Sequence, residues 1–231
     1  VGRISFFVNS GMRFVTETAK MASFTELWDE ICKKRFKISE AKYRRFRYGM
    51  QVNSLGLTEL QPENNVYRIL IQMLPVVIAK NSRARAVQLP AWNEALGLPR
   101  PWDQQWSLRL QQIMAYETDL LEFADIFKGS KVLKEKINAL KASANEELKK
   151  IDKIGGLVSA IDSGYLKSKL VESQTHRQKN IEKGDQKVVG VNCFAEGEQS
   201  PLVNEKDGGF MKVDDRAEKL QIENVVKWKS K

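Results

Sequence analysis

Polar side chains able to contact a ligand lie at the ends of two β-prone runs in this sequence. Arg3 and Ser5 lie at the start of the run ISFFVN, and Gln51 lies at the end of the run FRYGMQV. A guanidinium pairs with phosphate or carbonyl oxygens, and a serine hydroxyl offers a compact hydrogen bond. A glutamine amide can hydrogen-bond a carbonyl oxygen without offering an acidic proton. Taken alone, these residues are also compatible with a surface arginine and with satisfied polar side chains at strand ends.

Residues suited to metal binding or nucleophilic catalysis are scarce. Cys32 and Cys193 are isolated thiols without Cys-x-x-Cys spacing, and His176, the only histidine, lies in a charged helical segment. This pattern predicts neither a disulfide framework nor a zinc site. It favours a reducing cytoplasm as the location and a solvated His176.

The densest positive charge lies between residues 33 and 47. The whole chain has 38 basic and 29 acidic residues, a net charge of +9, which is compatible with nucleic acid, a membrane surface or an anionic ligand. We interpret the cluster first as a solvated helix end and loop, and second as a phosphate contact. Nucleic-acid binding is disfavoured, because no motif with interleaved stacking aromatic residues accompanies the charges. The cluster consists of Lys33, Lys34, Arg35, Lys37, Lys42, Arg44, Arg45 and Arg47.

The 231 residues are 42% hydrophobic and 29% charged, as in an ordinary globular protein. They contain no apolar run long enough to predict a membrane span, no signal-peptide pattern and no initiating methionine. We therefore expect no membrane association, and we expect the chain to be part of a longer protein.

The first two thirds of the sequence alternate β-prone runs with helical patterns, which is typical of βα units around a parallel sheet. Strands are predicted over 4–9, 46–52 and 84–89, helices over 12–34 and 62–80, and a helical turn at 93–96. Pro75 should kink or end the second helix. Further helices are predicted over 103–127, 131–152 and 164–183, then an extended segment at 188–192 and a basic helix at 214–229. Three βα units cannot close an eight-stranded barrel, so the chain is predicted to be a fragment or to be completed by another chain.

Six segments, in order, resemble the adenosylcobalamin-dependent acyl-CoA mutases, the family of methylmalonyl-CoA mutase. They are GRISFFVNSGMRFVTETAKM, MQVNSLGLTELQPENNVYR, LPAWNEALGLP, QQIMAYETDLLEFADIF, KIGGLVSAIDSGYLKSKLVES and IEKGDQKVVGVN. The stretch RAVQLPAWNEALGLPRPWDQQWSLRLQQ is more similar to the ethylmalonyl-CoA mutase branch than to methylmalonyl-CoA mutase itself.

The resemblance implies an α/β chain that forms the C-terminal part of a TIM-type (β/α)8 barrel, followed by a helical region and a linker. Residues 1–102 would hold the last three βα units of the acyl-CoA-binding barrel, 103–202 a helical region with a closing extended segment, and 203–231 a linker toward a cobalamin-binding domain. The implied reaction is a radical rearrangement of a short branched acyl-CoA, ethylmalonyl-CoA to methylsuccinyl-CoA. Methylmalonyl-CoA or a related acyl-CoA is the alternative substrate.

Four residues match substrate positions of that family. Arg3 and Ser5 match residues that contact the CoA part of the substrate, and Gln51 matches a residue near its thioester. Gly49 stands where methylmalonyl-CoA mutase carries a histidine, and this difference implies room for a longer acyl branch such as ethyl. Relief of crowding within a barrel strand is the alternative reading of Gly49.

Three loop residues, Ser54, Glu94 and Gly97, match positions that approach the corrin or its adenosyl group. Gly97 would permit close approach of a flat ring, whereas Glu94 could instead be a first-turn acid favoured by a helix dipole. The tryptophans Trp92, Trp102 and Trp106 could line a cofactor, but core packing is the favoured reading.

The resemblance places the family's catalytic and cobalt-ligating residues outside this chain. We therefore expect no catalytic residue and no metal ligand here, an isolated chain that is inactive, and partners that include the N-terminal barrel half and a cobalamin-binding domain. A homodimer is a possible assembly. The rival readings are a non-catalytic assembly protein that uses residues 103–187, and nucleic-acid binding through the basic cluster.

Overall fold

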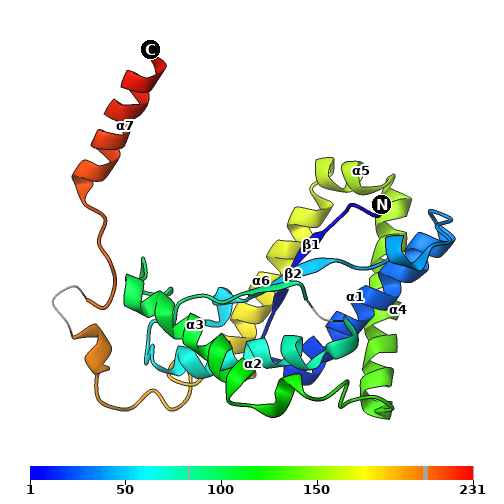
Figure 1. The fold of residues 1–231 in the computed structure, drawn as a ribbon, viewed down its shortest axis with the longest axis horizontal. Coiled ribbons are helices and arrows are strands. Elements are labelled where there is room, and N and C mark those ends of the chain that lie inside the picture. The colour runs from blue at the N-terminus through cyan, green and yellow to red at the C-terminus, as the bar shows by residue number, and fades with distance from the viewer. Residues whose placement is uncertain (83, 205–207, 231) are drawn as a thin grey trace.

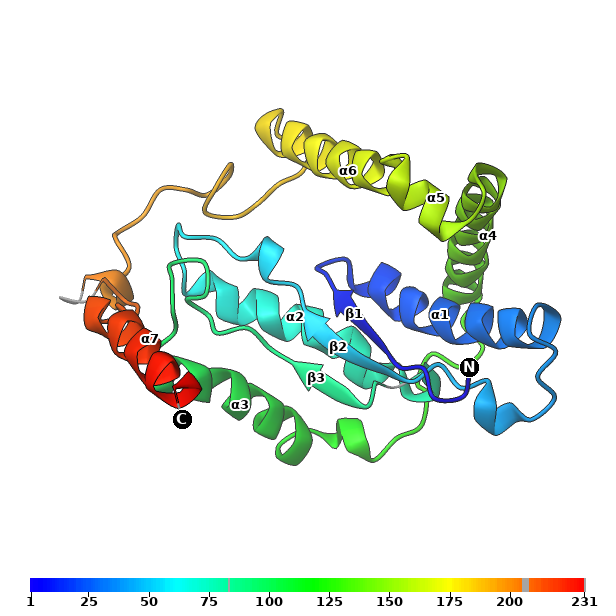
Figure 2. The same cartoon turned by 90° about the horizontal axis from the view of Figure 1, so that it is seen from above.

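The centre of the molecule is a sheet of three parallel strands. A computed structural model describes residues 1–82, 84–204 and 208–230, and in it the strands lie side by side in the order of the sequence (Figures 1 and 2). The elements of this part are β1 (Phe6–Ser10), α1 (Phe14–Lys34), β2 (Tyr48–Val52), α2 (Asn64–Ile78), β3 (Ala86–Gln88) and α3 (Pro101–Tyr116). The predicted α/β class and the three βα units are confirmed. The sheet is open in the described part of the chain, so the barrel itself stays a prediction.

Alternation of side chains gives the sheet one covered and one open face. Tyr48, Met50 and Val52 of β2 are almost fully buried, and Met21 of α1 and Val76 of α2 pack in one cluster with Tyr48 and Met50. Successive residues of a strand point to opposite faces, so the residues between them lie on the other side. Within the described residues no helix covers that other face, and it holds two of the four predicted substrate residues, Gly49 and Gln51.

The helix α3 belongs to the third βα unit rather than to a separate helical region. Its Met114 shares a buried cluster with Val52 of β2, Met73 of α2 and Leu89, which follows β3. A single helix was predicted over 103–127. The structure differs over the last third of that range, because α3 ends at Tyr116. Thr118 ends it, because its hydroxyl donates to the Met114 carbonyl at 2.6 Å and then accepts from the Leu120 amide.

Pro75 does not end α2, because the helix continues through it to Ile78, and the alternative of a kink stays a prediction. A proline removes the N–H that would bond the carbonyl four residues earlier, here Ile71. Ile71, whose carbonyl lacks that bond, is 40% exposed. Pro75 itself is fully buried and fills space in the core beneath the sheet.

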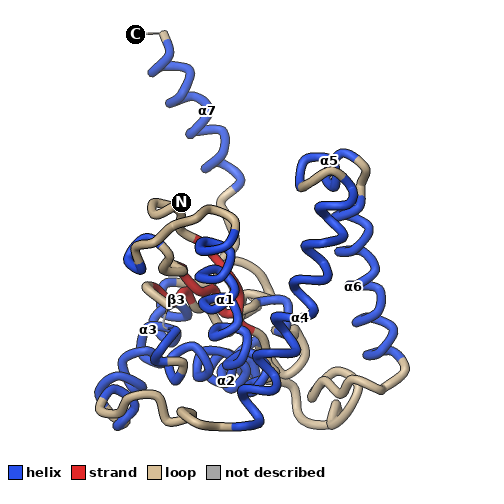
Figure 3. Tube along the Cα trace, turned by 90° about the vertical axis from the view of Figure 1, so that its right-hand side faces the viewer, coloured by secondary structure: helices blue, strands red, loops and turns tan. Residues whose placement is uncertain are grey.

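The helices α4 (Lys131–Ile154), α5 (Leu157–Asp162) and α6 (Tyr165–Glu182) form a hairpin with α5 at its tip (Figure 3). The sequence prediction missed α5, which follows Gly155 and Gly156, both at positive φ. The Tyr165 hydroxyl donates to Glu147 at 2.5 Å and ties the two long helices together.

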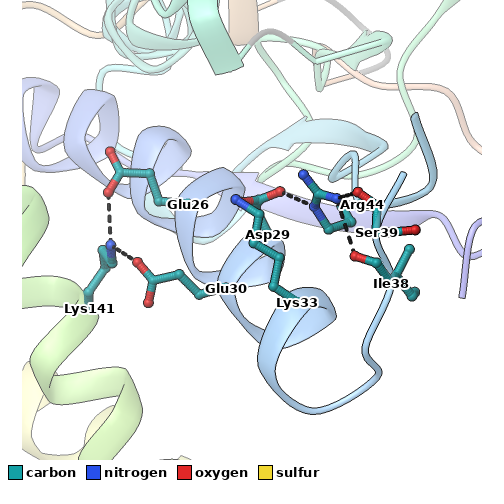
Figure 4. Close-up of polar contacts among 8 residues, drawn as sticks. All are labelled: Glu26, Asp29, Glu30, Lys33, Ile38, Ser39, Arg44 and Lys141. Carbon is teal, nitrogen blue, oxygen red and sulfur yellow. Dashed lines mark hydrogen bonds and ion pairs between the residues drawn. The ribbon is translucent and has the colours of Figure 1, made fainter. Parts of the chain in front are cut away.

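The hairpin is attached to the βα units through α1 and α4. The Lys141 ammonium donates to Glu26 at 2.9 Å and to Glu30 at 2.5 Å, both on α1, and its side chain is only 16% exposed (Figure 4). A second set of contacts on the same helix joins Asp29 to Lys33 at 2.6 Å and to Arg44 at 2.7 Å. These contacts hold the pKa of Asp29 below its ordinary value, through hydrogen bonds first from Lys33 and then from Arg44.

The segment 188–192 is a turn and not the predicted extended segment. Gly190 has φ +80°, and its amide donates to the Cys193 carbonyl at 2.8 Å. The Asn192 side chain accepts from the Val188 amide at 2.7 Å, and it donates to the carbonyls of Ile181, in the last turn of α6, and of Gln186, which follows that helix. Likewise, residues 93–96 form consecutive turns instead of a helical turn.

The predicted basic helix is confirmed as α7 (Asp215–Lys229), which projects away from the other elements (Figure 1). Leu220, Ile222, Val226 and Trp228 on it are all more than half exposed. Within the described residues, none of the helices has the length and apolar character needed to cross a membrane.

Candidate functional site

The open face of the sheet carries two rows of residues in register. In the first row, Phe7 pairs with Gly49 and Gly49 with Ala86. In the second row, two residues further along each strand, Asn9 pairs with Gln51 and Gln51 with Gln88. We call Asn9, Gln51 and Gln88 the amide row. The structure therefore brings the predicted residues Gly49 and Gln51 onto one face, and it adds four neighbours that the sequence reading did not select.

The predicted CoA-contacting residues Arg3 and Ser5 lie just before β1, at the amino edge of the sheet. Both are exposed, and neither side chain forms a hydrogen bond with another described residue. The predicted cofactor residues follow the carboxyl ends of β2 and β3. Since a parallel strand rises about 3.3 Å per residue, the two groups lie at opposite ends of the open face.

Gly49 borders the ring of Phe7. A Cβ at position 49 would lie 2.9 Å from Phe7 Cδ2, closer than real side chains approach. The Phe7 side chain is 61% exposed, so its ring lies across the space that the glycine leaves on the open face. This contact supports the reading in which Gly49 relieves crowding, and any extra room for an acyl branch depends on where Phe7 points.

The loop that follows β2 is held by side chains of α2. The Asn53 amide donates to Gln72 Oε1 at 3.1 Å, and Asn53 Oδ1 accepts from the Leu55 amide at 2.9 Å. Ser54 is half-buried in this loop, and its hydroxyl has no hydrogen-bond partner among the described residues. The hydroxyl is therefore available to a ligand at the carboxyl end of β2.

Asn65 and Arg68 of α2 brace the two loops at the carboxyl edge of the sheet. Asn65 Nδ2 donates to the carbonyls of Thr58 at 2.8 Å and Trp92 at 3.0 Å. The Arg68 guanidinium donates to Asn65 Oδ1 at 2.7 Å and to the Val189 carbonyl at 2.6 Å, and burial lowers its pKa. The sequence reading missed both roles, because the carbonyl partners are distant in the chain.

Glu94 and Gly97 lie in the loop after β3, and both are exposed. The Glu94 carboxylate has no hydrogen-bond or ion-pair partner among the described residues. Gly97 has φ +152°, and a Cβ there would lie 2.8 Å from Phe210 Cδ2. The side of Gly97 predicted to face a flat ring is thus occupied by a ring of the chain itself.

A buried carboxylate, Asp103 at the start of α3, organises this loop. It accepts from the Trp92 indole at 3.0 Å, from Asn93 Nδ2 at 2.7 Å, and from the Arg100 amide at 2.8 Å and guanidinium at 3.0 Å. Burial raises the pKa of Asp103, but the hydrogen bonds from Arg100 and Asn93 outweigh it and leave the pKa below its ordinary value. These hydrogen bonds to the buried Asp103 carboxylate therefore hold the loop that carries Glu94 in place.

The segment 208–211 closes over the same loop. Asn93 Nδ2 donates to the Gly209 carbonyl at 2.7 Å, and the Met211 amide donates to the Leu98 carbonyl at 2.7 Å. Together with the contact of Phe210 on Gly97, these bonds anchor the start of the predicted linker at the carboxyl edge of the sheet.

The three tryptophans Trp92, Trp102 and Trp106 form a cluster, as the sequence predicted, and its buried member has a packing role. Trp92 is 1% exposed, and its ring centroid lies 6.2 Å from Trp102 and 5.7 Å from Trp106. The latter two are more than a third exposed on α3. Trp92 thus packs in the core, as the favoured reading expected.

The remaining predicted features lie away from this face. His176 is exposed on α6, and both cysteines are free thiols, as expected. No group of residues able to hold a metal ion exists in the described part of the chain. In the basic cluster, Lys33 and Lys42 are more than half exposed and form ion pairs, which agrees with a solvated helix end and loop. Arg44 differs, because its side chain is only 11% exposed and pairs with Asp29.

Comparison with known proteins identifies the family of this chain. All 231 residues match the methylmalonyl-CoA mutase family, and the chain belongs to that family. It is 61% identical over 230 residues to the ethylmalonyl-CoA mutase of Cereibacter sphaeroides, covering 100% of this chain and 35% of that protein. It is 60% identical over 229 residues to the ethylmalonyl-CoA mutase of Methylorubrum extorquens, covering 99% and 33%.

The similarity to methylmalonyl-CoA mutases is lower. The human mitochondrial methylmalonyl-CoA mutase is 30% identical over 192 residues, covering 83% of this chain and 25% of that protein. The chain is thus a homologue of ethylmalonyl-CoA mutase that spans about a third of the length of these relatives.

Proposed function

We propose that this chain supplies the last three βα units of the acyl-CoA-binding barrel in a mutase that converts ethylmalonyl-CoA to methylsuccinyl-CoA. The 61% identity to an ethylmalonyl-CoA mutase across the whole chain, about twice that to the human methylmalonyl-CoA mutase, carries this proposal. The open sheet supports it, because a barrel interior needs a face free of helices.

The substrate would lie along the open face. Arg3 and Ser5 at the amino edge would contact the CoA part, and Gly49 and Gln51 would border the acyl group. Gln51 suits the thioester because a carboxamide donates a hydrogen bond and is not acidic. The chain's own task is to hold and orient the acyl group while a carbonyl-containing group migrates between adjacent carbons.

Adenosylcobalamin, when bound, would supply the deoxyadenosyl radical that starts the rearrangement. Ser54 and Glu94 fit a role in holding it, since both are accessible at the carboxyl edge and have no hydrogen-bond partner in the described part of the chain. Gly97 fits less well, because Phe210 covers it. The cobalt ligand and the catalytic residues would come from parts of the protein outside this chain, and we expect the isolated chain to be inactive.

The test is turnover by the full-length protein that contains this chain, purified and supplied with adenosylcobalamin. We expect methylsuccinyl-CoA from ethylmalonyl-CoA, with a higher kcat/KM than for methylmalonyl-CoA. Preference for methylmalonyl-CoA would establish the alternative substrate, and turnover of neither would favour a non-catalytic assembly role. Sedimentation of the same preparation tests whether the protein is a homodimer, and fractionation of cells tests the expected cytoplasmic location.

A further inference from the structure

A cavity of about 370 Å³ lies between α2 and the end of α6 with the segment that follows it. One wall carries Arg68 and Ile71 of α2, and the other carries Arg177 of α6 and residues 186–189. Ile71 is exposed, whereas Met73 on the same helix is buried in the core beneath the sheet. The cavity therefore lies on the outer side of α2, away from the open face of the sheet.

All charged residues that the structure describes in the wall of this cavity are cationic. They are Arg68, Arg177 and Lys187, and none of the three has an ion-pair partner in the described part of the chain. Asn64 and Gln186 add carboxamides to the same wall. The cavity thus gathers positive charge and N–H donors, which are the groups that bind oxygen-rich anions.

Arg68 is the least accessible of these cations. It is only 8% exposed, and three of its N–H groups donate to neutral oxygens, those of Thr58 at 2.8 Å, Asn65 at 2.7 Å and Val189 at 2.6 Å. A guanidinium has five N–H groups, so two of them have no partner among the described residues. Neutral acceptors do not cancel the charge, and a buried charge without a counter-ion is destabilising. An anion in the cavity would supply the missing counter-charge.

We propose that this cavity binds a phosphate group, carried by inorganic phosphate or by a small organic phosphate. A phosphate has several anionic oxygens, which suits convergent guanidinium and ammonium groups, and arginine matches its geometry with paired hydrogen bonds. A lone carboxylate carries one charge and would leave part of the positive charge uncompensated. Tyr67 and Ile71, which also line the cavity, would contact an organic part of the ligand. The site goes beyond the mutase function and does not depend on which acyl-CoA is the substrate.

Bound phosphate would connect elements that are far apart in the sequence. Arg68 lies on α2 and Arg177 on α6, and Arg177 already donates at 3.2 Å to the Leu55 carbonyl in the loop after β2. A phosphate that accepts from both arginines would hold α6 and the turn at 188–192 against the βα units. Amide hydrogen exchange of that turn should therefore slow when phosphate is added.

The experiment measures the Kd of inorganic phosphate for the full-length protein by phosphorus NMR, with the ionic strength held constant by chloride. Arg177→Met and Lys187→Met each remove one cation and leave the hydrogen bonds of Arg68 in place. Each should weaken phosphate binding about 10-fold, as expected for the loss of a hydrogen bond between charged groups. Lys179→Met removes an exposed lysine of α6 outside the cavity wall, so it is the matched control and should leave the Kd unchanged.

Two further measurements sharpen the test. Lys187→Glu places a carboxylate in the wall and should abolish phosphate binding, and a thermal melt checks that this variant is folded. Phenyl phosphate distinguishes the two carriers of the phosphate group: tighter binding than inorganic phosphate would indicate an organic ligand, and equal or weaker binding would assign the site to inorganic phosphate.

Two results would overturn this inference. One is an unmodified protein that does not bind phosphate, and the other is a set of variants that bind it as tightly as the unmodified protein does. Equal stabilisation of all variants by phosphate would likewise reflect only its general exclusion from protein surfaces. None of these results bears on turnover of ethylmalonyl-CoA, which tests the proposed function separately.

Discussion

Asp103 Oδ1 lies 3.0 Å from the indole nitrogen of Trp92, and this contact fastens the start of α3 to the loop that follows β3. The same carboxylate holds Asn93, which in turn donates to the Gly209 carbonyl. One buried side chain thus connects a strand end, a helix start and a segment more than a hundred residues later.

Asp103→Ala should lower the free energy of unfolding by about 3–5 kcal/mol, because it leaves buried donors of Trp92, Asn93 and Arg100 without their acceptor. Urea unfolding followed by tryptophan fluorescence measures this change. Asp162→Ala, at an exposed aspartate of α5, is the control and should stay within about 0.5 kcal/mol. Equal effects of the two substitutions would contradict a central role for Asp103.

The stability contributed by Asp103 should depend on pH. Its pKa in the folded chain is below the ordinary value of about 3.9, so its contribution is fully present above that pH. It is lost as the pH falls below about 4, through the folded pKa. The free energy of unfolding of the unmodified chain should therefore decrease more steeply between about pH 4 and pH 2 than that of Asp103→Asn. Parallel curves for the two proteins would show that Asp103 does not titrate in this way.

Phe210→Ala should loosen the segment 208–211 from the loop that carries Gly97. Tryptic cleavage after Lys212 should become faster, because proteases cut locally opened chain. Phe194→Ala removes a ring that is 74% exposed and serves as the control. An unchanged cleavage rate would mean that the bonds of Gly209 and Met211 suffice to hold the segment.

Lys141→Met should weaken the attachment of α4 to α1, since Lys141 bridges Glu26 and Glu30 while mostly removed from water. Methionine keeps the length of the aliphatic stem, so the loss reports the charge contacts. Amide hydrogen exchange should accelerate across α4, whereas Lys149→Met, at an exposed position of the same helix, should leave it unchanged. Protection that is equal in both variants would assign the attachment to apolar packing.

Gly49→Ala should be destabilising only when Phe7 is present. The new methyl group would meet the Phe7 ring at 2.9 Å, and crowding of this kind costs about 1 kcal/mol where the ring can still move. In a Phe7→Ala background the same substitution should be neutral or stabilising, because alanine fits a strand better than glycine. Thermal melts of the four proteins give the coupling between the residues. Additive effects would show that the two side chains do not compete for space.

Sequence periodicity predicted the elements whose signal is local. The three strands and the long helices α1, α4, α6 and α7 lie close to their predicted ranges. Helix α1 buries residues against its neighbours, whereas α7 forms with its apolar residues exposed. Pro75 was expected to kink or end α2, and the helix continues through it, since the buried proline ring packs in the core. The turn at 188–192 was missed, although Gly190 and Asn192 carry the signal for it.

Only part of the candidate site could be predicted from the sequence. Gln51 and Gly49 were selected from resemblance, but their neighbours Asn9 and Gln88 become visible only when the strand register is known. Likewise, Asn93 and Asp103 look like ordinary polar residues until the fold brings Gly209 beside them. Pairings between distant segments leave no local pattern in the sequence.

The ladder between β2 and β3 consists of three pairs, and Gln88 is in the last of them. Side chains alternate along a strand, so a slip of β3 by one residue would turn Gln88 into the core and bring Val87 out onto the open face. A protein molecule with an unchanged sequence and an otherwise intact fold would then present a valine where the amide belongs. Folding errors at this short ladder would therefore create a subpopulation with an altered open face, which an average measurement would not separate from the correctly paired molecules.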